Sequence, residues 1–468
     1  MMDAATAAQA ISARLEGGNA WFDGVATDSR TVRPGELFVA LKGERFDGHQ
    51  FVAQAFERGA AAAIIAADRV AELMTVVGSA GARSLIAVAD PLQALGRLAA
   101  FWRRRFSLPV AAVVGSNGKT TVKEMAAAIL RVARGSDRVL ATAGNLNNEI
   151  GLPLMVLRLR SVNAAAVFEI GMNHVGETTY LSDIAQPTIA VINNAQREHQ
   201  EFMKSVADVA AEHATIFGAL PPQGIAVINA DDDYASFWHE VIVRRNAEGA
   251  ALTVRDFGLR APATVAGKVR PQAWGNAIDV ATPEGSTSVE LRMPGRHNAA
   301  NALAAIAAAT AAGASLDAVA QGLAAFRPIA GRLQPKTGRN GATLIDDSYN
   351  ANPDSVGAAI AVLVHAPGAK WLVLGDMGEV GDQGPAFHRE IGESARAAGI
   401  DRLLTLGELT PHAVDAFGPG AEHFASGEEL VAAIACDMTR DVTVLVKGSR
   451  FMHMERVVAA LGGAAEGH

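Results

Sequence analysis

The chain has 468 residues, of which 50% are apolar and 19% are charged, so its length predicts two or three domains and its composition excludes a disordered protein. The formal net charge of −8, with no long basic run, gives no reason to expect a nucleic-acid partner. A single cysteine, Cys436, excludes an internal disulfide framework, and no run of about 18 apolar residues is present, so the sequence predicts a cytoplasmic protein without membrane insertion.

Residues 1–90 are predicted to form a first α/β unit. Strand-like apolar runs alternate with a helical pattern in this segment, with strands at 37–41, 62–66 and 85–88 and a helix at 50–58. This alternation of strands and helices is typical of an α/β unit. Asp90 and Pro91 form a helix-start signal, which marks the expected end of the unit.

The second unit, residues 91–327, contains a glycine turn between a strand at 110–114 and a helix that begins at Lys119. This order suits a phosphate site, because glycines let several N–H groups face one anion, while a helix N-terminus, a lysine and a threonine hydroxyl supply charge and a magnesium ligand. The predicted nucleotide-binding residues are Gly115, Ser116, Asn117, Gly118, Lys119, Thr120 and Thr121. The alternative is an ordinary helix-capping turn, since Val113 stands where the usual pattern has its first glycine.

Other strands of the second unit, predicted at 164–168, 188–192 and 225–228, also end in polar residues. In an open parallel sheet these ends line one crevice. Glu169 would there bind magnesium together with Thr120, or else cap a helix. His199 alone is more typical of a hydrogen-bonded loop, and 231–233 is interpreted as a solvated turn. Residues 250–292 suggest an antiparallel flap or sheet edge, and 296–312 an Ala-rich helix.

The third unit, residues 328–468, alternates strands with helical segments and is predicted to be a Rossmann-like, doubly wound sheet. Strands are expected up to 347 and at 371–374, 403–406 and 442–446. Asp346 and Asp347 end the first of them, so one of the two could face a ligand. The sequence therefore predicts an α/β protein of three domains, with mostly parallel sheets in the second and third.

Together and in this order, the motifs resemble the Mur ligase family, whose members join an amino acid or peptide to a UDP-muramoyl substrate. The resemblance covers essentially the whole chain. Besides the glycine turn, Glu169 and His199, it rests on His297-Asn298-Ala299-Ala300-Asn301, Gly331-Arg332 and Asp347-Ser348. Members of this family commonly lack the first glycine of the usual pattern, so Val113 no longer argues against a phosphate site. The resemblance implies an N-terminal uridine-nucleotide domain, a central ATPase domain and a C-terminal domain that closes over ATP.

Within the family, the chain is most similar to members that add D-alanyl-D-alanine to UDP-N-acetylmuramoyl-tripeptide. The similar segments are 28–30, 46–49 and 347–353, while the Asp-Asn-Pro-Arg motif of the diaminopimelate- or lysine-adding ligase is absent from the sequence. The resemblance implies an acyl-phosphate intermediate formed from ATP with Mg²⁺, a place in peptidoglycan synthesis and a monomer. A sister ligase, including folylpolyglutamate synthase, and a P-loop nucleotide switch stand as alternatives. The third residue of the peptide, diaminopimelate or lysine, is left open.

The resemblance also implies roles for individual residues. Catalytic roles fall to Lys119, Glu169, His199 and Arg332, and magnesium would be bound by Thr120, Glu169 and His199. The nucleotide would be contacted by the glycine turn together with Asn298 and Asn301 at the adenine, Arg332 at the phosphates and Asp347 at the ribose. Substrate contacts are expected, several of them from position alone, at Ser29, Arg30, Asn147, Asn148, Asn350, Asn352 and Lys447.

One position departs from the family. Most members carry a lysine, carbamoylated in use, on the helix after the histidine that corresponds to His199, whereas His213 stands there in this chain. A neutral imidazole cannot supply the two oxygens of a carbamate. A second magnesium site must therefore be completed differently, by water or by a neighbouring acid such as Glu212.

Overall fold

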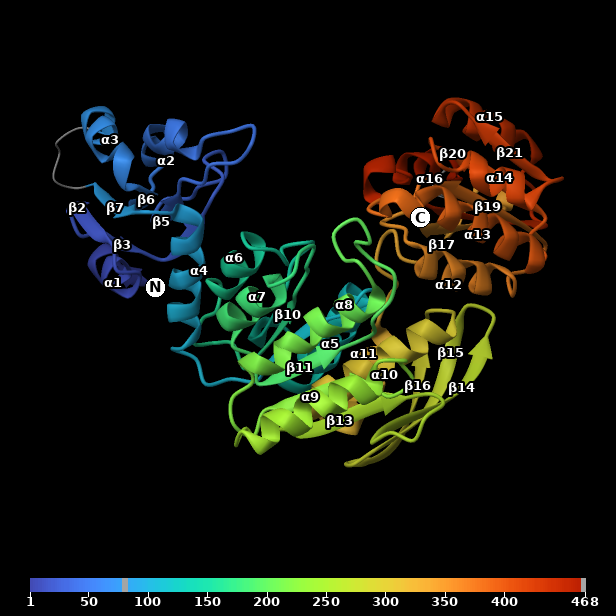
Figure 1. Ribbon diagram of the computed structural model, residues 1–468, viewed down its shortest axis with the longest axis horizontal. Coiled ribbons are helices and arrows are strands. Elements are labelled where there is room, and N and C mark those ends of the chain that lie inside the picture. The colour runs from blue at the N-terminus through green and yellow to red at the C-terminus, as the bar shows by residue number, and fades with distance from the viewer. Residues whose placement is uncertain (78–82, 464–468) are drawn as a thin grey trace.

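The computed structural model describes residues 1–77 and 83–463. Three α/β bodies follow one another along the chain, each built around its own sheet (Figure 1). The predicted fold class is thereby confirmed, while the domain limits at residues 90 and 328 stay predictions. Within the described residues, no helix combines the length and the apolar character needed to cross a lipid bilayer.

The N-terminal body has a five-stranded sheet in the order β2-β7-β6-β5-β4, with β4 to β7 parallel and β2 antiparallel at the edge. The strands of this body are β1 (Met2–Asp3), β2 (Arg14–Gly17), β3 (Trp21–Phe22), β4 (Gly24–Ala26), β5 (Glu36–Val39), β6 (Ala62–Ala66) and β7 (Ser84–Val88), of which β1 and β3 pair with each other outside the five-stranded sheet. Its helices are α1 (Ala4–Ala10), α2 (Val52–Glu57) and α3 (Val70–Val77). The antiparallel edge was not predicted from the sequence.

The central body has a nine-stranded sheet in the order β16-β15-β14-β13-β12-β11-β8-β10-β9. Its strands are β8 (Val110–Val114), β9 (Val139–Ala141), β10 (Ala165–Glu169), β11 (Ile189–Ile192), β12 (Ile225–Asn229), β13 (Thr253–Gly258), β14 (Val265–Gln272), β15 (Gly275–Thr282) and β16 (Gly285–Leu291). Strands β14 to β16 form the predicted antiparallel flap at one edge of this sheet, whereas β13 pairs parallel with both β12 and β14.

The helices of the central body are α4 (Pro91–Arg103), α5 (Lys119–Arg134), α6 (Gly151–Val156), α7 (Glu177–Ala185), α8 (Val206–Ala214), α9 (Ala235–Ala247), α10 (Arg296–Ala311) and α11 (Leu316–Ala325). Every residue of β8 is buried, and alternate residues belong to two different apolar cores. Ala112 and Val114 pack in the core that includes α4, whereas Ala111 and Val113 pack against α5 and α10. This two-sided burial explains why the strand reads as one continuous apolar run.

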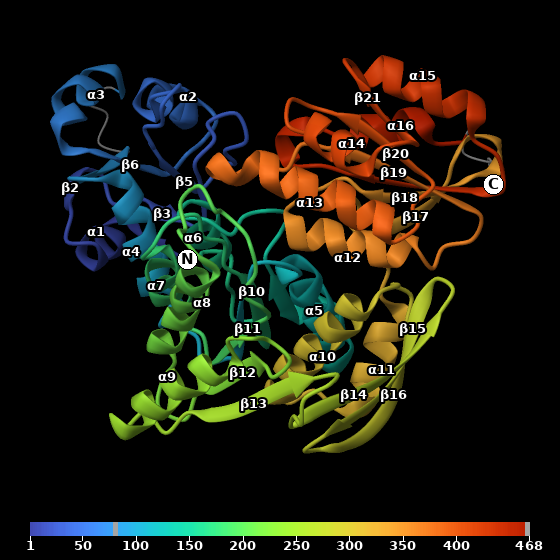
Figure 2. The ribbon, with the colours of Figure 1, turned by 45° about the vertical axis from the view of Figure 1, so that its right-hand side comes forward.

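The C-terminal body has a six-stranded sheet in the order β17-β18-β22-β19-β20-β21, with only β17 antiparallel. Its elements are β17 (Gln334–Thr337), β18 (Thr343–Asp347), β19 (Ala369–Gly375), β20 (Arg402–Leu406), β21 (Ala421–Phe424), β22 (Val442–Lys447), α12 (Pro353–Leu363), α13 (Gly384–Ala397), α14 (Pro411–Phe417), α15 (Gly427–Asp437) and α16 (Glu455–Leu461). Figure 2 shows α12 on the side of this body that faces α5 and α10.

Candidate active site

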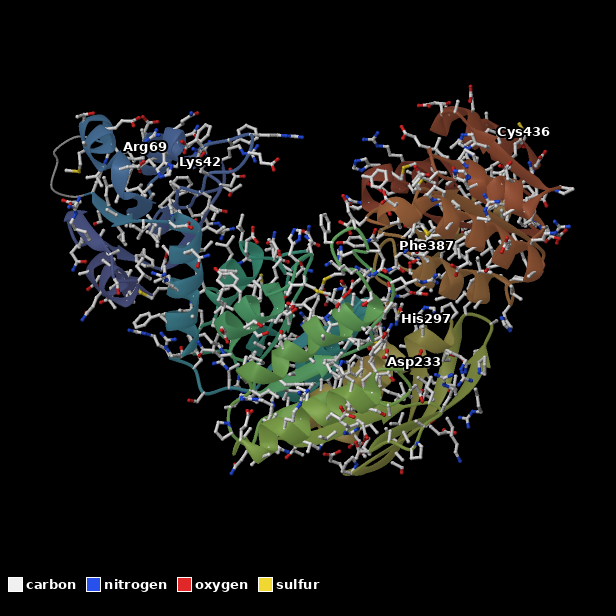
Figure 3. All side chains as sticks on the ribbon, viewed as in Figure 1. Lys42, Arg69, Asp233, His297, Phe387 and Cys436 are labelled. Carbon is white, nitrogen blue, oxygen red and sulfur yellow. The ribbon has the colours of Figure 1, made fainter. Side chains whose placement is uncertain are left out.

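A large cleft of about 1230 Å³ lies where the central and C-terminal bodies meet. Its walls include the carboxyl ends of β8, β10, β11 and β12, the amino ends of α5 and α10, and the start of α12. β8 lies between β10 and β11, so the strand order reverses at this point of the sheet. Ligands of open α/β sheets bind at such switch points. His297 and Phe387, labelled in Figure 3, mark the boundary between the two bodies.

The turn between β8 and α5 together with the first two residues of α5, residues 115–120, is called the phosphate loop from here on. Gly118 is left-handed with φ 81°, and a Cβ added there would lie 2.4 Å from the Asn301 Oδ1 atom, so both the backbone and the space require glycine. The loop is held from behind by the end of β11, since the Asn117 N–H donates to Asn194 Oδ1 at 2.8 Å and Asn193 Nδ2 donates to the Asn117 carbonyl at 2.7 Å. The loop is therefore rigid before any nucleotide binds.

Lys119 begins α5 and its ammonium folds back over the phosphate loop. The Nζ atom donates to the Gly115 carbonyl and lies 3.3 Å from Glu198 Oε2. Arg332, which belongs to the C-terminal body, stacks over Tyr349 with 4.3 Å from its guanidinium carbon to the ring centroid, and its Nη2 donates to Thr120 Oγ1 at 2.9 Å. Two cations from two bodies thus meet at the helix N-terminus, where phosphate oxygens are favoured.

Glu169 is the last residue of β10, the strand next to β8 in the sheet, and its side chain is buried. Asn147 Nδ2 donates to Glu169 Oε1 at 2.7 Å, while Glu169 Oε2 has no hydrogen-bond partner among the described residues. The Asn148 side chain instead stabilises the start of α6, where it accepts a hydrogen bond from the Gly151 N–H. Asn147 and Asn148 both line the cleft, as does Glu169.

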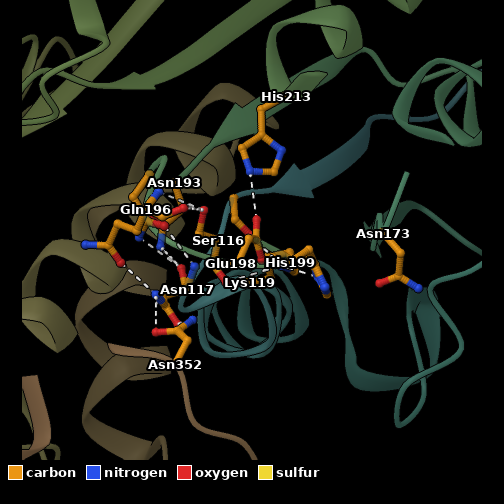
Figure 4. Close-up of polar contacts among 12 residues, drawn as sticks. Ser116, Asn117, Lys119, Asn173, Asn193, Gln196, Glu198, His199, His213 and Asn352 are labelled. Carbon is orange, nitrogen blue, oxygen red and sulfur yellow. Dashed lines mark hydrogen bonds and ion pairs between the residues drawn. The ribbon is translucent and has the colours of Figure 1, made fainter. Parts of the chain in front are cut away.

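The segment after β11, residues 193–203, is called the β11 loop. It carries His199, which is left-handed with φ 50°, a conformation uncommon for a residue other than glycine. His199 Nδ1 lies 2.6 Å from Glu379 Oε2 of the C-terminal body. Figure 4 shows Glu198 between Lys119, His199 and His213. The β11 loop therefore brings a carboxylate and an imidazole to the phosphate loop.

Glu198 is 6% exposed and was not identified from the sequence. Its Oε1 lies 3.2 Å from His213 Nε2, and its Oε2 lies 3.7 Å from His199 Nε2. Burial would raise the pKa of the Glu198 carboxyl, but the charge of Lys119 and the two neighbouring histidines lower it to about 2. No sequence pattern singled it out, because the lysine and one of the histidines come from other segments.

Arg197, also missed, fastens the β11 loop to the C-terminal body. Its guanidinium pairs with Asp354 at 2.7 Å and with Glu390 at 2.7 Å, and its backbone N–H donates to Asp354 Oδ2. Hydrogen bonds with Glu390 and Asp354 raise the pKa of the guanidinium above its ordinary value. The side chain also lies over the Phe387 ring, 5.3 Å from its centroid.

Asn352 makes a second contact between the bodies. Its side chain caps α12 by accepting from the Ser355 N–H, and its Nδ2 donates to Asn117 Oδ1 at 3.0 Å. Pro353 follows at the first position of α12, where its missing N–H costs nothing. The predicted substrate residue Asn352 thus lies against the phosphate loop in this structure.

Asn298 and Asn301 lie one turn apart at the start of α10, are buried and line the cleft. Asn301 Oδ1 accepts from Asn193 Nδ2 at 2.8 Å, and Asn298 Nδ2 donates to the Pro294 carbonyl. Their neighbour His297 is close to Asp347 and Lys447 of the C-terminal body, and burial lowers the pKa of its imidazole to about 4.

Asp347 and Lys447 end the adjacent parallel strands β18 and β22 and form a buried pair at 2.7 Å. Asp347 Oδ1 also accepts from the Leu333 N–H, and Lys447 Nζ also donates to the Asn350 carbonyl. Asp347, Lys447 and Asn350 all line the cleft. In this structure the carboxylate predicted to bind the ribose and the amine predicted to bind the incoming peptide are paired with each other.

Ser29 and Arg30 lie in the N-terminal body and do not line the cleft. The Ser29 hydroxyl donates to Gln54 Oε1 at 2.8 Å, while Arg30 is exposed and pairs with Asp28 at 2.8 Å. The structure therefore groups the predicted site residues of the second and third units and leaves these two apart.

Two expectations about acidic residues were wrong. Glu212 does not reach the cleft, because its two carboxylate oxygens accept from the Gly176 and Thr178 N–H groups at the start of α7. The run 231–233 is more than a solvated turn, because Asp231 accepts from the N–H groups of residues 259–261 and Asp232 Oδ2 accepts from the Ala195 N–H. Both errors come from contacts between segments far apart in the sequence.

Magnesium fits the residues at the phosphate loop. The described chain holds no ready group of three or more His, Cys, Asp or Glu ligands. Mg²⁺ does not require one, because it keeps several waters and is bound by one or two protein oxygens together with phosphates. The unpartnered Oε2 of Glu169 and the Thr120 hydroxyl are oxygens of this kind.

The fold and the site define an α/β protein that holds phosphate groups in a cleft between two bodies. Three segments match domain descriptions of one family: residues 22–103 match the Mur ligase family, catalytic domain, residues 113–309 the Mur ligase middle domain, and residues 331–450 the Mur ligase, glutamate ligase domain. The chain belongs to the Mur ligase family.

Individual relatives are similar over almost the whole length. The UDP-N-acetylmuramoyl-tripeptide–D-alanyl-D-alanine ligase of Escherichia coli is 41% identical, with 96% of each chain covered. The structure of MurF from Acinetobacter baumannii superposes with a TM-score of 0.87 at 33% identity over 98% of each chain. MurF ligase from Thermotoga maritima, solved in complex with ADP, gives a TM-score of 0.79 at 26% identity over 94% of this chain and 96% of that one.

Proposed function

We propose that this chain is an ATP-dependent ligase that joins D-alanyl-D-alanine to UDP-N-acetylmuramoyl-tripeptide, giving the UDP-muramoyl-pentapeptide precursor of peptidoglycan. The observation that carries the proposal is the 41% identity over 96% of both chains with a ligase of that name. The cleft agrees with it, because a phosphate loop and a second cation, Arg332, converge on one point. The proposal includes Mg²⁺ as the metal, a cytoplasmic location and a monomer.

A carboxylate does not react directly with an amine at neutral pH, because its leaving group would be an oxide. The terminal carboxylate of the tripeptide therefore attacks the γ-phosphorus of ATP, and the bond to ADP breaks. The amine of D-alanyl-D-alanine then attacks the acyl-phosphate carbon, loses a proton, and phosphate leaves as the amide forms. The net change is ATP to ADP and phosphate, with one new C–N bond.

In this reaction Lys119 and the free N–H groups at the start of α5 hold the phosphate oxygens, and Arg332 adds charge from the opposite wall. Such fixed donors are worth most where charge develops during phosphoryl transfer. Thr120 and Glu169 would hold Mg²⁺, which supplies further charge neutralisation when bound. Asn298 and Asn301 would contact the adenine.

Closure of the C-terminal body protects the acyl phosphate from water. Arg197 and Asn352 tie the two bodies together directly beside the phosphate loop. Exclusion of water from a closed site prevents hydrolysis of a reactive intermediate. These contacts support the proposal that the C-terminal body closes over the nucleotide.

The test is ADP release measured with both substrates, with each alone and with neither. The expected result is turnover only when both substrates are present. Mass spectrometry should then show a pentapeptide product with either the diaminopimelate-containing or the lysine-containing tripeptide. ADP release without any UDP-linked peptide would instead identify a nucleotide switch. Turnover of UDP-N-acetylmuramoyl-dipeptide with free diaminopimelate or lysine would identify a sister ligase.

A further inference from the structure

Glu198 is a buried carboxylate whose surroundings are incomplete. It is 6% exposed and lines the cleft. Its Oε1 lies 3.2 Å from His213 Nε2, but neither atom has a hydrogen-bond partner of acceptable geometry in the described chain. Buried polar atoms in native proteins are nearly always hydrogen-bonded, so this carboxylate, which belongs to a residue that lines the cleft, is incompletely satisfied by the protein.

The spacing around Glu198 indicates a cation. Its Oε2 lies 3.7 Å from His199 Nε2, which is too long for a hydrogen bond. Two ligand atoms that share one small divalent cation, each about 2.1 Å from it, lie roughly 3.0–4.2 Å apart. The separation of the carboxylate and the imidazole falls inside that range.

The Lys119 ammonium already shows that this carboxylate attracts positive charge, because Nζ lies 3.3 Å from Glu198 Oε2. In the proposed function Lys119 turns to the phosphates of ATP. Glu198 would then lose its nearest cation while remaining buried. A buried carboxylate without a counter-ion is unfavourable, so a divalent cation beside His199 restores the balance.

We propose that Glu198 is a ligand of a second divalent cation, bound with His199 beside the phosphate loop. The inference rests on the proposed function, which supplies ATP at this point. Glu198 then takes the position in the second metal site for which Glu212 was considered. Its carboxylate belongs to the chain itself, unlike the carbamate that other family members form on a lysine. His213 then packs against the carboxylate from the buried side and is not itself a ligand.

The test counts bound cations with Mn²⁺ as the probe and AMP-PNP as a nucleotide that is not turned over. Free Mn²⁺ is followed by electron paramagnetic resonance during titration of the full chain, and ¹⁴N couplings of the bound ion are recorded by spin-echo modulation. The variants are Glu198→Gln and Glu198→Asp. Glu201→Gln is the matched control, because it removes one charge from the same loop at an exposed position that does not line the cleft.

The expected result is two Mn²⁺ per chain in the wild type, with a nitrogen coupling on one of them. In Glu198→Gln, the affinity for the coupled Mn²⁺ should fall at least tenfold, while the other Mn²⁺ stays bound. The retained ion also shows that the variant is folded. Glu198→Asp should bind both, with the coupled ion weakened, and Glu201→Gln should match the wild type.

Three outcomes would overturn the assignment: one Mn²⁺ in the wild type, two ions of unchanged affinity in Glu198→Gln, or tighter AMP-PNP binding in that variant with an unchanged metal count. The last would make Glu198 only a counter-ion of Lys119. Because no turnover is measured, these results stand apart from the test of the ligase activity.

Discussion

The phosphate loop and the β11 loop leave adjacent parallel strands, β8 and β11, at the same edge of one sheet, yet they are held in different ways. The backbone of the phosphate loop is held from within the central body, by Asn193 and Asn194, and the C-terminal body contacts it only through the side chains of Asn117 and Thr120. The β11 loop is bonded to the central body at Ala195, but Arg197 and His199 are held by Asp354, Glu379 and Glu390 of the C-terminal body.

This difference separates two tasks. A loop that is rigid before binding can hold the phosphates of ATP with little loss of conformational freedom. A loop whose geometry depends on a second body can place its carboxylate and imidazole only when the two bodies are docked. We therefore expect the first loop to bind the nucleotide and the second loop to couple closure of the two bodies to the reaction.

The largest effect is expected from Lys119→Ala. Removing the ammonium takes away one of the two side-chain cations expected on the transferred phosphate, so turnover should fall by roughly 10³-fold or more. ADP release with both substrates measures the effect, and circular dichroism should show an unchanged fold. Lys268→Ala, at an exposed position on β14, is the control and should retain activity. Activity near the wild-type level in Lys119→Ala would remove the phosphate loop from the mechanism.

Arg197→Ala should act on the second loop alone. The variant loses charge-assisted hydrogen bonds to Asp354 and Glu390; because these side chains are partly exposed to solvent, the whole network is expected to contribute about 1.5–3 kcal/mol, so turnover should fall roughly 10- to 100-fold. Nucleotide affinity should change little, because the phosphate loop is held separately. Turnover and AMP-PNP binding are measured in parallel, and small-angle scattering should show a larger radius of gyration.

A matched control for Arg197 is Arg270→Ala, which breaks an arginine–aspartate pair within the flap, with Asp279. Its turnover and radius of gyration should match the wild type. If Arg197→Ala weakens AMP-PNP binding as much as it slows turnover, the two loops do not act independently and the comparison fails.

The sequence predicted the first loop well and the second poorly, and the reason lies in where their contacts come from. Gly115, Gly118 and Lys119 form a continuous pattern whose geometry follows from the residues themselves. Glu198 gains its surroundings from Lys119 and His213, which are distant in sequence. The fold was likewise predictable where apolar runs are buried on both faces, as in β8, whereas the short antiparallel edges β2 and β17 carry no comparable signal.

Gly118→Ala tests how rigid the first loop is. A residue other than glycine at φ 81° costs about 1–2 kcal/mol, and the added Cβ would also lie 2.4 Å from Asn301 Oδ1. Gly144→Ala is the control, because Gly144 has φ 55° but no described atom within 4 Å of its Cβ position. Thermal unfolding should show a larger loss of stability for Gly118→Ala. Equal losses would mean that Asn301 yields and that the loop is softer than its contacts indicate.

The smallest effect concerns the pKa of His297, which reports on docking directly. Burial beside Asp347 and Lys447 lowers that pKa to about 4, below its ordinary value of 6.5. Between pH 6.5 and 4 the imidazole of the unfolded chain is therefore protonated while that of the folded chain is not, so the free energy of unfolding falls as the pH drops through this window. His297→Asn should remove this part of the pH-dependent loss of stability. Proton NMR should give a pKa near 4 in the wild type and a value closer to 6.5 in Arg197→Ala, because loosening the β11 loop lets water reach the imidazole. An unchanged pKa in that variant would show that the C-terminal body stays docked without Arg197, and that the β11 loop follows closure rather than holding it.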